Sequence, residues 1–301
     1  MILNFDFGTI RTTEFGVGRD DQDTRIFHLM SVDVGVQTAL QEMAKSSWDS
    51  MQALNTNPDK YEPAEKYAAY EYLYLGLNED LAKSMKELHE ANNLPVDMAS
   101  LADPKKVFCY FAQMTDGQGR RLTAVRRAAQ FKGALKARLI QLTTDSLKLI
   151  TDHVFKLDSD FDLVIDSANV SILRPSGFEF TAQLEEAVLQ SVPKNLQAVQ
   201  RELTFVDFTN IQEFAGKHPR AARYLASIRS QKEMKNINQK LLQKTCRMTG
   251  VQVKVVDGKI VVPEWHIMGF LEVLDRRRYE VNLVKGSPEQ YKAASRKKLD
   301  Q

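Results

Sequence analysis

The spacing of apolar and polar positions separates the chain into strand-forming and helix-forming stretches. An apolar run at 105–114 is followed by the turn TDGQG and a second apolar run at 120–125, which together predict a β-hairpin. Residues 24–32 also favour a strand. Residues 34–54 and 78–94 show helical periodicity.

Further along, short strand-like runs give way to helices. Four runs rich in Leu, Ile and Val are separated by polar breaks, at 137–143, 146–151, 161–166 and 169–174. Such close spacing predicts an antiparallel, meander-like sheet. From residue 181 helical patterns dominate, interrupted by an Asp-Gly hairpin at 251–262.

The predicted fold class is therefore α+β, with an antiparallel, meander-like sheet in the middle of the chain and a largely helical C-terminal part. We expect an N-terminal α/β region over residues 1–105 and a second domain over 106–301. Within the second domain, the sheet should occupy 106–180, and 181–301 should be helical and basic.

One predicted helix, 218–250, carries two stripes of side chains. The apolar stripe should pack on the core and consists of Met234, Ile237, Leu241 and Met248. Lys240, Lys244 and Arg247 follow one another at i, i+4 and i+7, so they should form a neighbouring stripe that faces outward.

Composition places the chain among ordinary soluble proteins. It has 301 residues, of which 43% are hydrophobic and 27% charged, so it is able to bury a sizeable core. We expect no signal peptide and no membrane-spanning run of about 20 apolar residues. Cys109 and Cys246 lie far apart and offer neither zinc spacing nor a disulfide framework, which is typical of the cytoplasm.

Charge changes this picture, because a net charge of +2 conceals strong segregation. Residues 119–142 carry net +7 and residues 217–249 carry net +8, whereas 1–118 and 143–216 carry net −9 and −7. Like charges crowded together require a partner. That partner is either a polyanion such as nucleic acid or the chain's own acidic blocks, and a basic run can also be a solvated face.

The two basic blocks supply the candidate DNA-binding residues. These are Arg120, Arg121, Arg126, Arg127, Lys132, Lys136, Arg138, Lys240, Lys244 and Arg247. Together they are expected to form one surface that pairs with the phosphates of duplex DNA. No helix-turn-helix or zinc-finger pattern is present, so binding should depend strongly on salt and weakly on sequence.

No catalytic residue, metal site or cofactor is expected. The five histidines are scattered, and no G-x-S-x-G, phosphate-binding loop or dinucleotide fingerprint occurs. One enzymatic alternative is a metal-dependent nuclease that uses the aspartates of DSDFDLVID, between Asp158 and Asp166. The competing interpretation is that these acids flank a buried strand, because the following strand has no acid-x-Lys pair.

Several segments together resemble the B protein family of the Kiwa anti-phage defence system. The resemblance rests on RAAQFKGALKARLI, FKLDSDFDLVID, VSILRPSGFEF and FLEVLDRRRYEV followed by SRKK. It extends from about Lys106 to Lys298. These motifs are not catalytic signatures, and the family offers no catalytic residues to carry over.

The resemblance implies an anti-phage effector that binds DNA and blocks phage replication or gene expression. Such a protein would be cytoplasmic and recruited to the inner membrane by a multi-span membrane partner, Kiwa A. A homo-oligomer is expected, because multivalency strengthens weak DNA contacts. An alternative is a protein-interaction subunit whose basic blocks dock on acidic partner surfaces.

Overall fold

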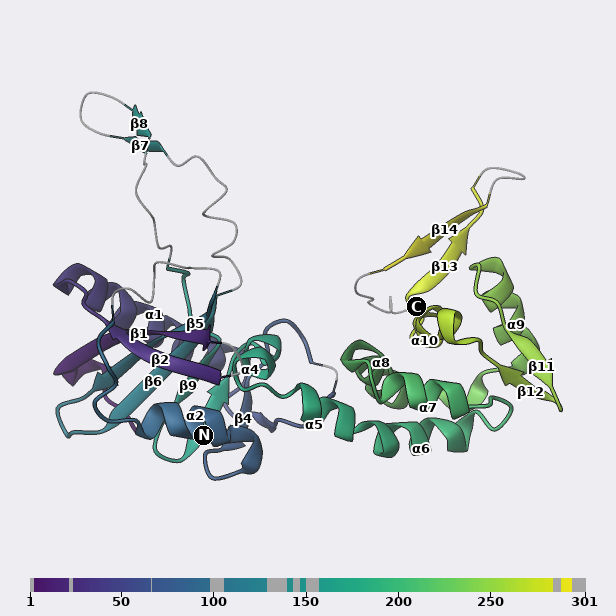
Figure 1. Ribbon diagram of the computed structural model, residues 1–301, viewed down its shortest axis with the longest axis horizontal. Helices are drawn as coiled ribbons and strands as arrows, with labels where there is room; N and C mark the ends of the chain where they lie inside the picture. The colour runs from purple at the N-terminus through teal and green to yellow at the C-terminus, as the bar shows by residue number, and fades with distance from the viewer. Residues whose placement is uncertain are drawn as a thin grey trace. The chain divides into compact units, whose positions relative to one another are not determined.

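A computed structural model describes residues 3–21, 24–65, 67–97, 106–128, 140–142, 147–149, 157–283 and 288–293 (Figure 1). The chain forms two compact units. The first contains residues 1–61 and 67–183, and the second contains 62–66 and 184–301. Each unit has its own hydrophobic core.

The first unit is built on an eight-stranded sheet with the order β2-β1-β5-β6-β9-β10-β4-β3. The strands are β1 (Thr12–Asp21), β2 (Thr24–Met30), β3 (Asp59–Lys60), β4 (Leu73–Gly76), β5 (Val107–Thr115), β6 (Arg121–Arg127), β9 (Leu163–Ile165) and β10 (Asn169–Ile172). All neighbouring strands in it are antiparallel except β3 and β4. Strands β5, β6, β9 and β10 are neighbours in the sheet in the order in which they occur along the chain, with β7 and β8 of a separate sheet between β6 and β9. The predicted antiparallel, meander-like sheet is therefore confirmed.

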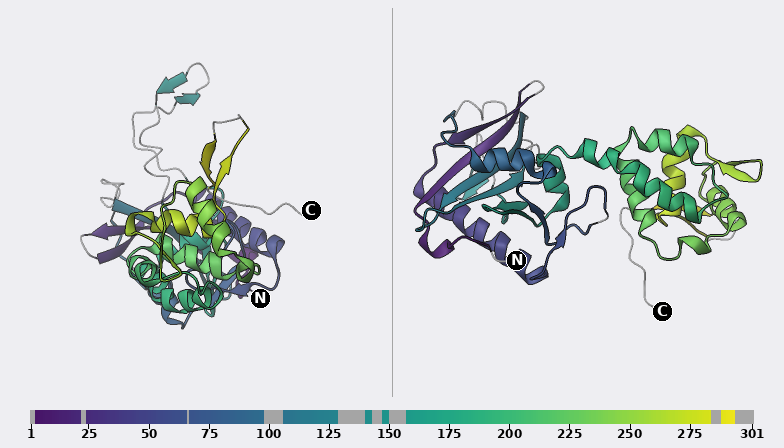
Figure 2. Two further views of the ribbon diagram at one scale, coloured as in Figure 1. Left: turned by 90° about the vertical axis from the view of Figure 1, so that its right-hand side faces the viewer. Right: turned by 90° about the horizontal axis from the view of Figure 1, so that it is seen from below.

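Helices cover both faces of this sheet (Figure 2). Helix α1 (Val34–Leu54) packs on the face that carries Tyr110, Ala112 and Ala124. Residues of alternate parity point to the other face, where Gln113 donates a hydrogen bond to the carbonyl of Leu88 in α2 (Lys83–Glu90). Helix α4 (Pro175–Thr181) also contacts β6.

The predicted division at residue 105 falls inside the first unit, where β1 pairs with β5 over most of its length. Strand β1 itself was not predicted.

The two runs at 137–143 and 146–151 form the strands β7 (Ile140–Leu142) and β8 (Leu147–Leu149). These strands pair with each other in a separate two-stranded sheet and not with the eight-stranded sheet.

The second unit is largely helical, as the sequence predicted. Its helices are α5 (Glu185–Gln190), α6 (Val192–Glu202), α7 (Thr209–Ala215), α8 (Pro219–Arg229), α9 (Gln239–Met248) and α10 (Ile267–Leu274). Two hairpins accompany them, β11 (Lys254–Val256) with β12 (Lys259–Val261) and β13 (Arg278–Val281) with β14 (Glu289–Lys292). The first turns at Asp257 and Gly258, which both have positive φ, as the Asp-Gly pair predicted.

The single long helix expected over 218–250 is wrong. The chain forms α8, a 3-10 turn at Met234–Asn236 and then α9, which begins after the N-cap Asn238. The Asn238 side chain accepts hydrogen bonds from the backbone N–H groups of Lys240 and Leu241. A helical period counted across this break therefore misplaces the side chains that follow it.

The assignment of the apolar stripe to the core is corrected for the same reason. Leu241 is 63% exposed and Met248 is 38% exposed, although Met234 is buried. The core-facing residues of α9 are Leu242 and Cys246, one turn apart. No helix among the described residues is long and apolar enough to cross a membrane.

Candidate nucleic-acid interface

Arg120 and Arg121 stand at the start of β6, and both are engaged within the first unit. The carboxylate of Asp116 accepts hydrogen bonds from the backbone N–H and the Nε of Arg120, at 2.9 and 2.7 Å. Burial raises the pKa of Asp116, but hydrogen bonds from the backbone N–H of Arg120 and from neighbouring donors outweigh it and lower the pKa to about 2. Arg121 donates to the carbonyls of His89 and Ala91, so its charge meets only neutral acceptors.

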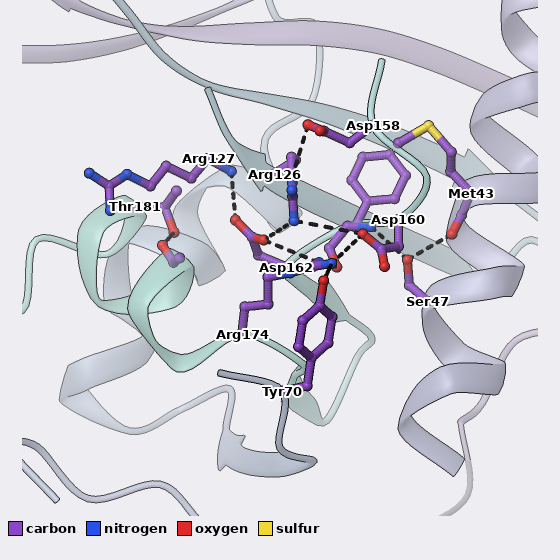
Figure 3. Close-up of polar contacts among 12 residues, drawn as sticks. Met43, Ser47, Tyr70, Arg126, Arg127, Asp158, Asp160, Asp162, Arg174 and Thr181 are labelled. Atoms are coloured by element: carbon purple, nitrogen blue, oxygen red, sulfur yellow. Dashed lines mark hydrogen bonds and ion pairs between the residues drawn. The ribbon is translucent and has the colours of Figure 1, made fainter. Parts of the chain in front are cut away.

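Arg126, near the end of β6, lies in a compact ion-pair cluster (Figure 3). Its Nη1 is 2.5 Å from Asp162 Oδ1, and its Nε is 3.1 Å from Asp158 Oδ2. Arg174 completes the cluster, 2.5 Å from Asp160 and 3.4 Å from Asp162. The basic block and the aspartate run, which are separate in sequence, are therefore one structural feature.

The electrostatics of this cluster favour a structural role for its carboxylates. Burial raises the pKa of the Asp162 carboxyl, whereas Arg126 and Arg174 favour its charged form. Both of its oxygens are occupied, since Oδ2 accepts from the backbone N–H of Arg127. Within the described ranges, no group of three or more His, Cys, Asp or Glu residues is arranged to hold a metal ion.

Arg127, the next residue, has a different environment. Its guanidinium stacks on the ring of Phe180 with a distance of 3.9 Å to the centroid, and its side chain extends away from the aspartates (Figure 3). Its Nε is buried without a hydrogen-bond acceptor in the structure. Of the arginines at 120, 121, 126 and 127, Arg127 is thus the one whose side chain forms no hydrogen bond or ion pair with a carboxylate or a carbonyl among the described residues.

Three further candidates of the first block, Lys132, Lys136 and Arg138, lie outside the described residues. The candidates of the second block all lie on α9. Lys240, Lys244 and Arg247 are exposed. In the part of the chain that the structure describes, none of the three forms an ion pair.

The geometry of α9 explains this exposure. Residues of an α-helix are spaced by about 100°, so positions i, i+4 and i+7 share one side. Leu242 and Cys246 anchor the opposite side in the core of the second unit. The predicted i, i+4, i+7 basic stripe is therefore present, and it points outward.

Sequence reasoning did not single out two lysines that the fold brings near this helix. Lys254 and Lys259 are exposed on the β11–β12 hairpin. The hairpin is tied to α9, because Gln239 Nε2 donates to the carbonyl of Gly258 at 2.8 Å. The Asp-Gly turn predicted the hairpin, but no local pattern showed that it meets the basic helix.

The protein is thus of the α+β class and has two units. The sheet unit contains a cluster of ion pairs, and the helical unit carries an exposed basic helix. A family model described as "Kiwa protein KwaB-like" matches residues 105–283. Because this match covers more than half of the chain, the chain belongs to the Kiwa protein KwaB-like family. That membership confirms the resemblance and associates the chain with Kiwa anti-phage defence.

The matched range includes part of each unit, from the start of β5 through β13. It therefore contains the ion-pair cluster, Arg127 and the whole of α9. No curated protein and no solved structure matches the chain significantly.

Proposed function

We propose that this protein acts in anti-phage defence by binding DNA with little sequence specificity, through Lys and Arg contacts to phosphates. The observation that carries the proposal is the outward basic face of α9, formed by Lys240, Lys244 and Arg247. These side chains have no carboxylate partner within the described ranges, so their charge is available to a polyanion. Bound DNA would be hindered as a template for phage replication or expression.

Arg127 is a separate candidate for phosphate contact, on the first unit. Among the described residues its guanidinium forms no ion pair, and stacking on Phe180 holds it in place without neutralising it. Arg126 has the opposite role, because its charge is balanced by Asp158 and Asp162. Of these two neighbours, we therefore assign phosphate contact to Arg127 and not to Arg126.

The proposal includes a membrane partner and a second copy of the chain. The family association with Kiwa supports a membrane-embedded partner, Kiwa A, that recruits this protein to the inner membrane. A homo-oligomer would place two basic helices on one DNA molecule and raise the apparent affinity. No catalytic step is part of the proposal.

The test is a salt titration of binding to random-sequence duplex DNA. The variant Lys240→Gln/Lys244→Gln/Arg247→Gln should bind more weakly and lower the log–log salt slope by about 2.7, at roughly 0.9 per phosphate contact. All three side chains are exposed, so the fold should be retained.

A matched control removes the same charge elsewhere. Three exposed lysines each pair with a carboxylate: Lys45, Lys194 and Lys217. Changing these three to Gln should leave the salt slope unchanged. An equal loss of slope in both triple variants would mean that net charge, and not the α9 face, governs binding.

A docking role on acidic protein surfaces is the alternative that the exposed apolar side chain of Leu241, beside the basic stripe, favours. It predicts that the α9 triple variant loses capture of Kiwa A, while the wild-type protein does not bind DNA at low salt.

A further inference from the structure

We infer that α9 lies in the major groove of duplex DNA with the β11–β12 hairpin along the adjacent phosphates, an inference that rests on the proposed function. Binding to phosphates requires only a basic surface, whereas groove insertion requires duplex DNA and a single helix that enters it.

Both ends of helix α9 form side-chain hydrogen bonds with neighbouring hairpins. At its N-terminus, Gln239 donates to the carbonyl of Gly258 in the β11–β12 turn. At its C-terminus, Gln290 of β14 donates to the carbonyl of Met248 at 2.8 Å. The helix therefore lies between two hairpins of the same unit (Figure 1). A support of this kind fixes the orientation of an exposed helix.

The size of α9 suits a groove. Its ten residues span about 15 Å at about 1.5 Å per residue, and the major groove of B-form DNA, about 12 Å wide, admits one α-helix. The basic side chains at positions 240, 244 and 247 would reach the phosphates that border the groove.

The exposed apolar residues of α9 favour insertion over contact with phosphates alone. Leu241 is 63% exposed and directly follows Lys240. A helix that touched only the backbone would leave this side chain in water. The floor of the major groove offers thymine methyl groups as apolar partners.

Other forms of nucleic acid fit less well. The major groove of A-form RNA is deep and narrow, which excludes a helix. Single strands are bound mainly by aromatic stacking, and α9 (QKLLQKTCRM) contains no aromatic residue. Lys254 and Lys259 extend the positive charge beside the helix, as phosphate contacts next to a groove require.

The experiment measures binding of the full-length protein to duplex DNA, duplex RNA and single-stranded DNA by fluorescence anisotropy. Duplex DNA should bind most tightly, and methyl green, which occupies the major groove, should compete where netropsin in the minor groove does not.

The variant Leu241→Gln keeps every charge. It should weaken duplex binding about ten-fold, or about 1.4 kcal/mol, without changing the salt slope. The matched control Leu54→Gln alters a leucine at the end of α1 that is 49% exposed, and it should bind normally. The variant Lys254→Gln/Lys259→Gln should lower the slope by about 1.8.

The outcomes separate the two proposals. Equal affinity for all three nucleic acids, no effect of Leu241→Gln and competition by neither ligand would overturn groove insertion, while a loss of slope in the α9 triple variant would retain the proposed function. No binding to any nucleic acid at low salt would overturn both.

Discussion

The sharpest test of the ion-pair cluster replaces Arg126 with methionine. The change removes the guanidinium from Asp158 and Asp162 and keeps most of the side-chain volume. The Arg126 and Asp162 side chains are only 13% and 3% exposed, so the remaining carboxylates cannot be fully hydrated. Breaking a buried ion pair from one side costs about 3–5 kcal/mol.

Arg174 remains beside Asp162 at 3.4 Å, so we place the loss for Arg126→Met at about 3 kcal/mol, the lower end of that range. For a unit of this size, each kcal/mol shifts the Tm by roughly 2–4 °C, which predicts a decrease of about 6–12 °C. The neighbouring control, Arg127→Met, removes the same charge but only a stacking contact with Phe180, at about 1 kcal/mol.

The assay follows the first unit alone. The chain has two tryptophans: Trp48 packs against the core of the first unit, and Trp265 belongs to the second unit and is 79% exposed. In a Trp265→Phe background, tryptophan fluorescence in urea therefore reports the unfolding of the first unit. A double-mutant cycle with Asp158→Asn should recover part of the loss, because the two side chains interact directly.

DNA binding should rank the two variants in the opposite order to stability. At a temperature where both variants are folded, Arg127→Met should lower the salt slope by about 0.9, and Arg126→Met should lower it little. Equal losses of stability in the two variants, or an unchanged stability in Arg126→Met, would refute the assignment of Arg126 to an internal cluster.

Two further predictions concern buried positions of the first unit. Burial, with a smaller contribution from Arg121, lowers the pKa of His89 to about 4, so the unfolded chain binds a proton first as the pH falls below about 6.5. Stability should therefore be full above that pH and decrease by on the order of 3 kcal/mol toward pH 4, and His89→Gln should remove this dependence in urea titrations. In α4, a Cβ on Gly177 would lie 2.3 Å from Asp162 Oδ2, so Gly177→Ala should destabilise the first unit by about 1–3 kcal/mol, measured by the same fluorescence assay. Stability that is independent of pH in the wild type, or an unchanged midpoint for Gly177→Ala, would contradict these interpretations.

The sequence predicted the helices and strands that are determined by neighbouring residues, such as a capping residue or a turn. Helix α1 was predicted from Val34 to about Leu54 and is observed over Val34–Leu54. Its beginning has a local cause, because the side chain of Asp33 accepts a hydrogen bond from the N–H of Val36. The β11–β12 hairpin followed from its Asp-Gly turn. Of the closely spaced apolar runs that predicted the meander, 161–166 and 169–174 lie in the sheet as β9 and β10, whereas 137–143 and 146–151 pair with each other as β7 and β8.

Strand β1 was missed because glycines weaken a strand pattern. Gly16 and Gly18 are required there by tertiary contacts. A Cβ at Gly16 would lie 2.2 Å from the ring of Phe111, and one at Gly18 would lie 2.7 Å from that of Phe108. The aromatic residues belong to β5, about 90 residues away in the chain, so only the folded sheet explains the glycines.

The sequence shows where the basic residues lie along the chain, but it does not show which of them are already paired with acidic residues in the folded protein. The first basic block includes Arg126, whose partners Asp158 and Asp162 are 32 and 36 residues further along and reach it only because β6 pairs with β9. The surplus of that block is thus partly balanced by the acidic block that follows it. Helix α9 belongs to the second block, whose 33 residues contain one acid, so its charge has few local counter-ions. Both interpretations of blocky charge, internal pairing and an external polyanion, therefore apply to this chain, each to a different block, and an experiment that reverses Arg126 and Arg127 together would confound them.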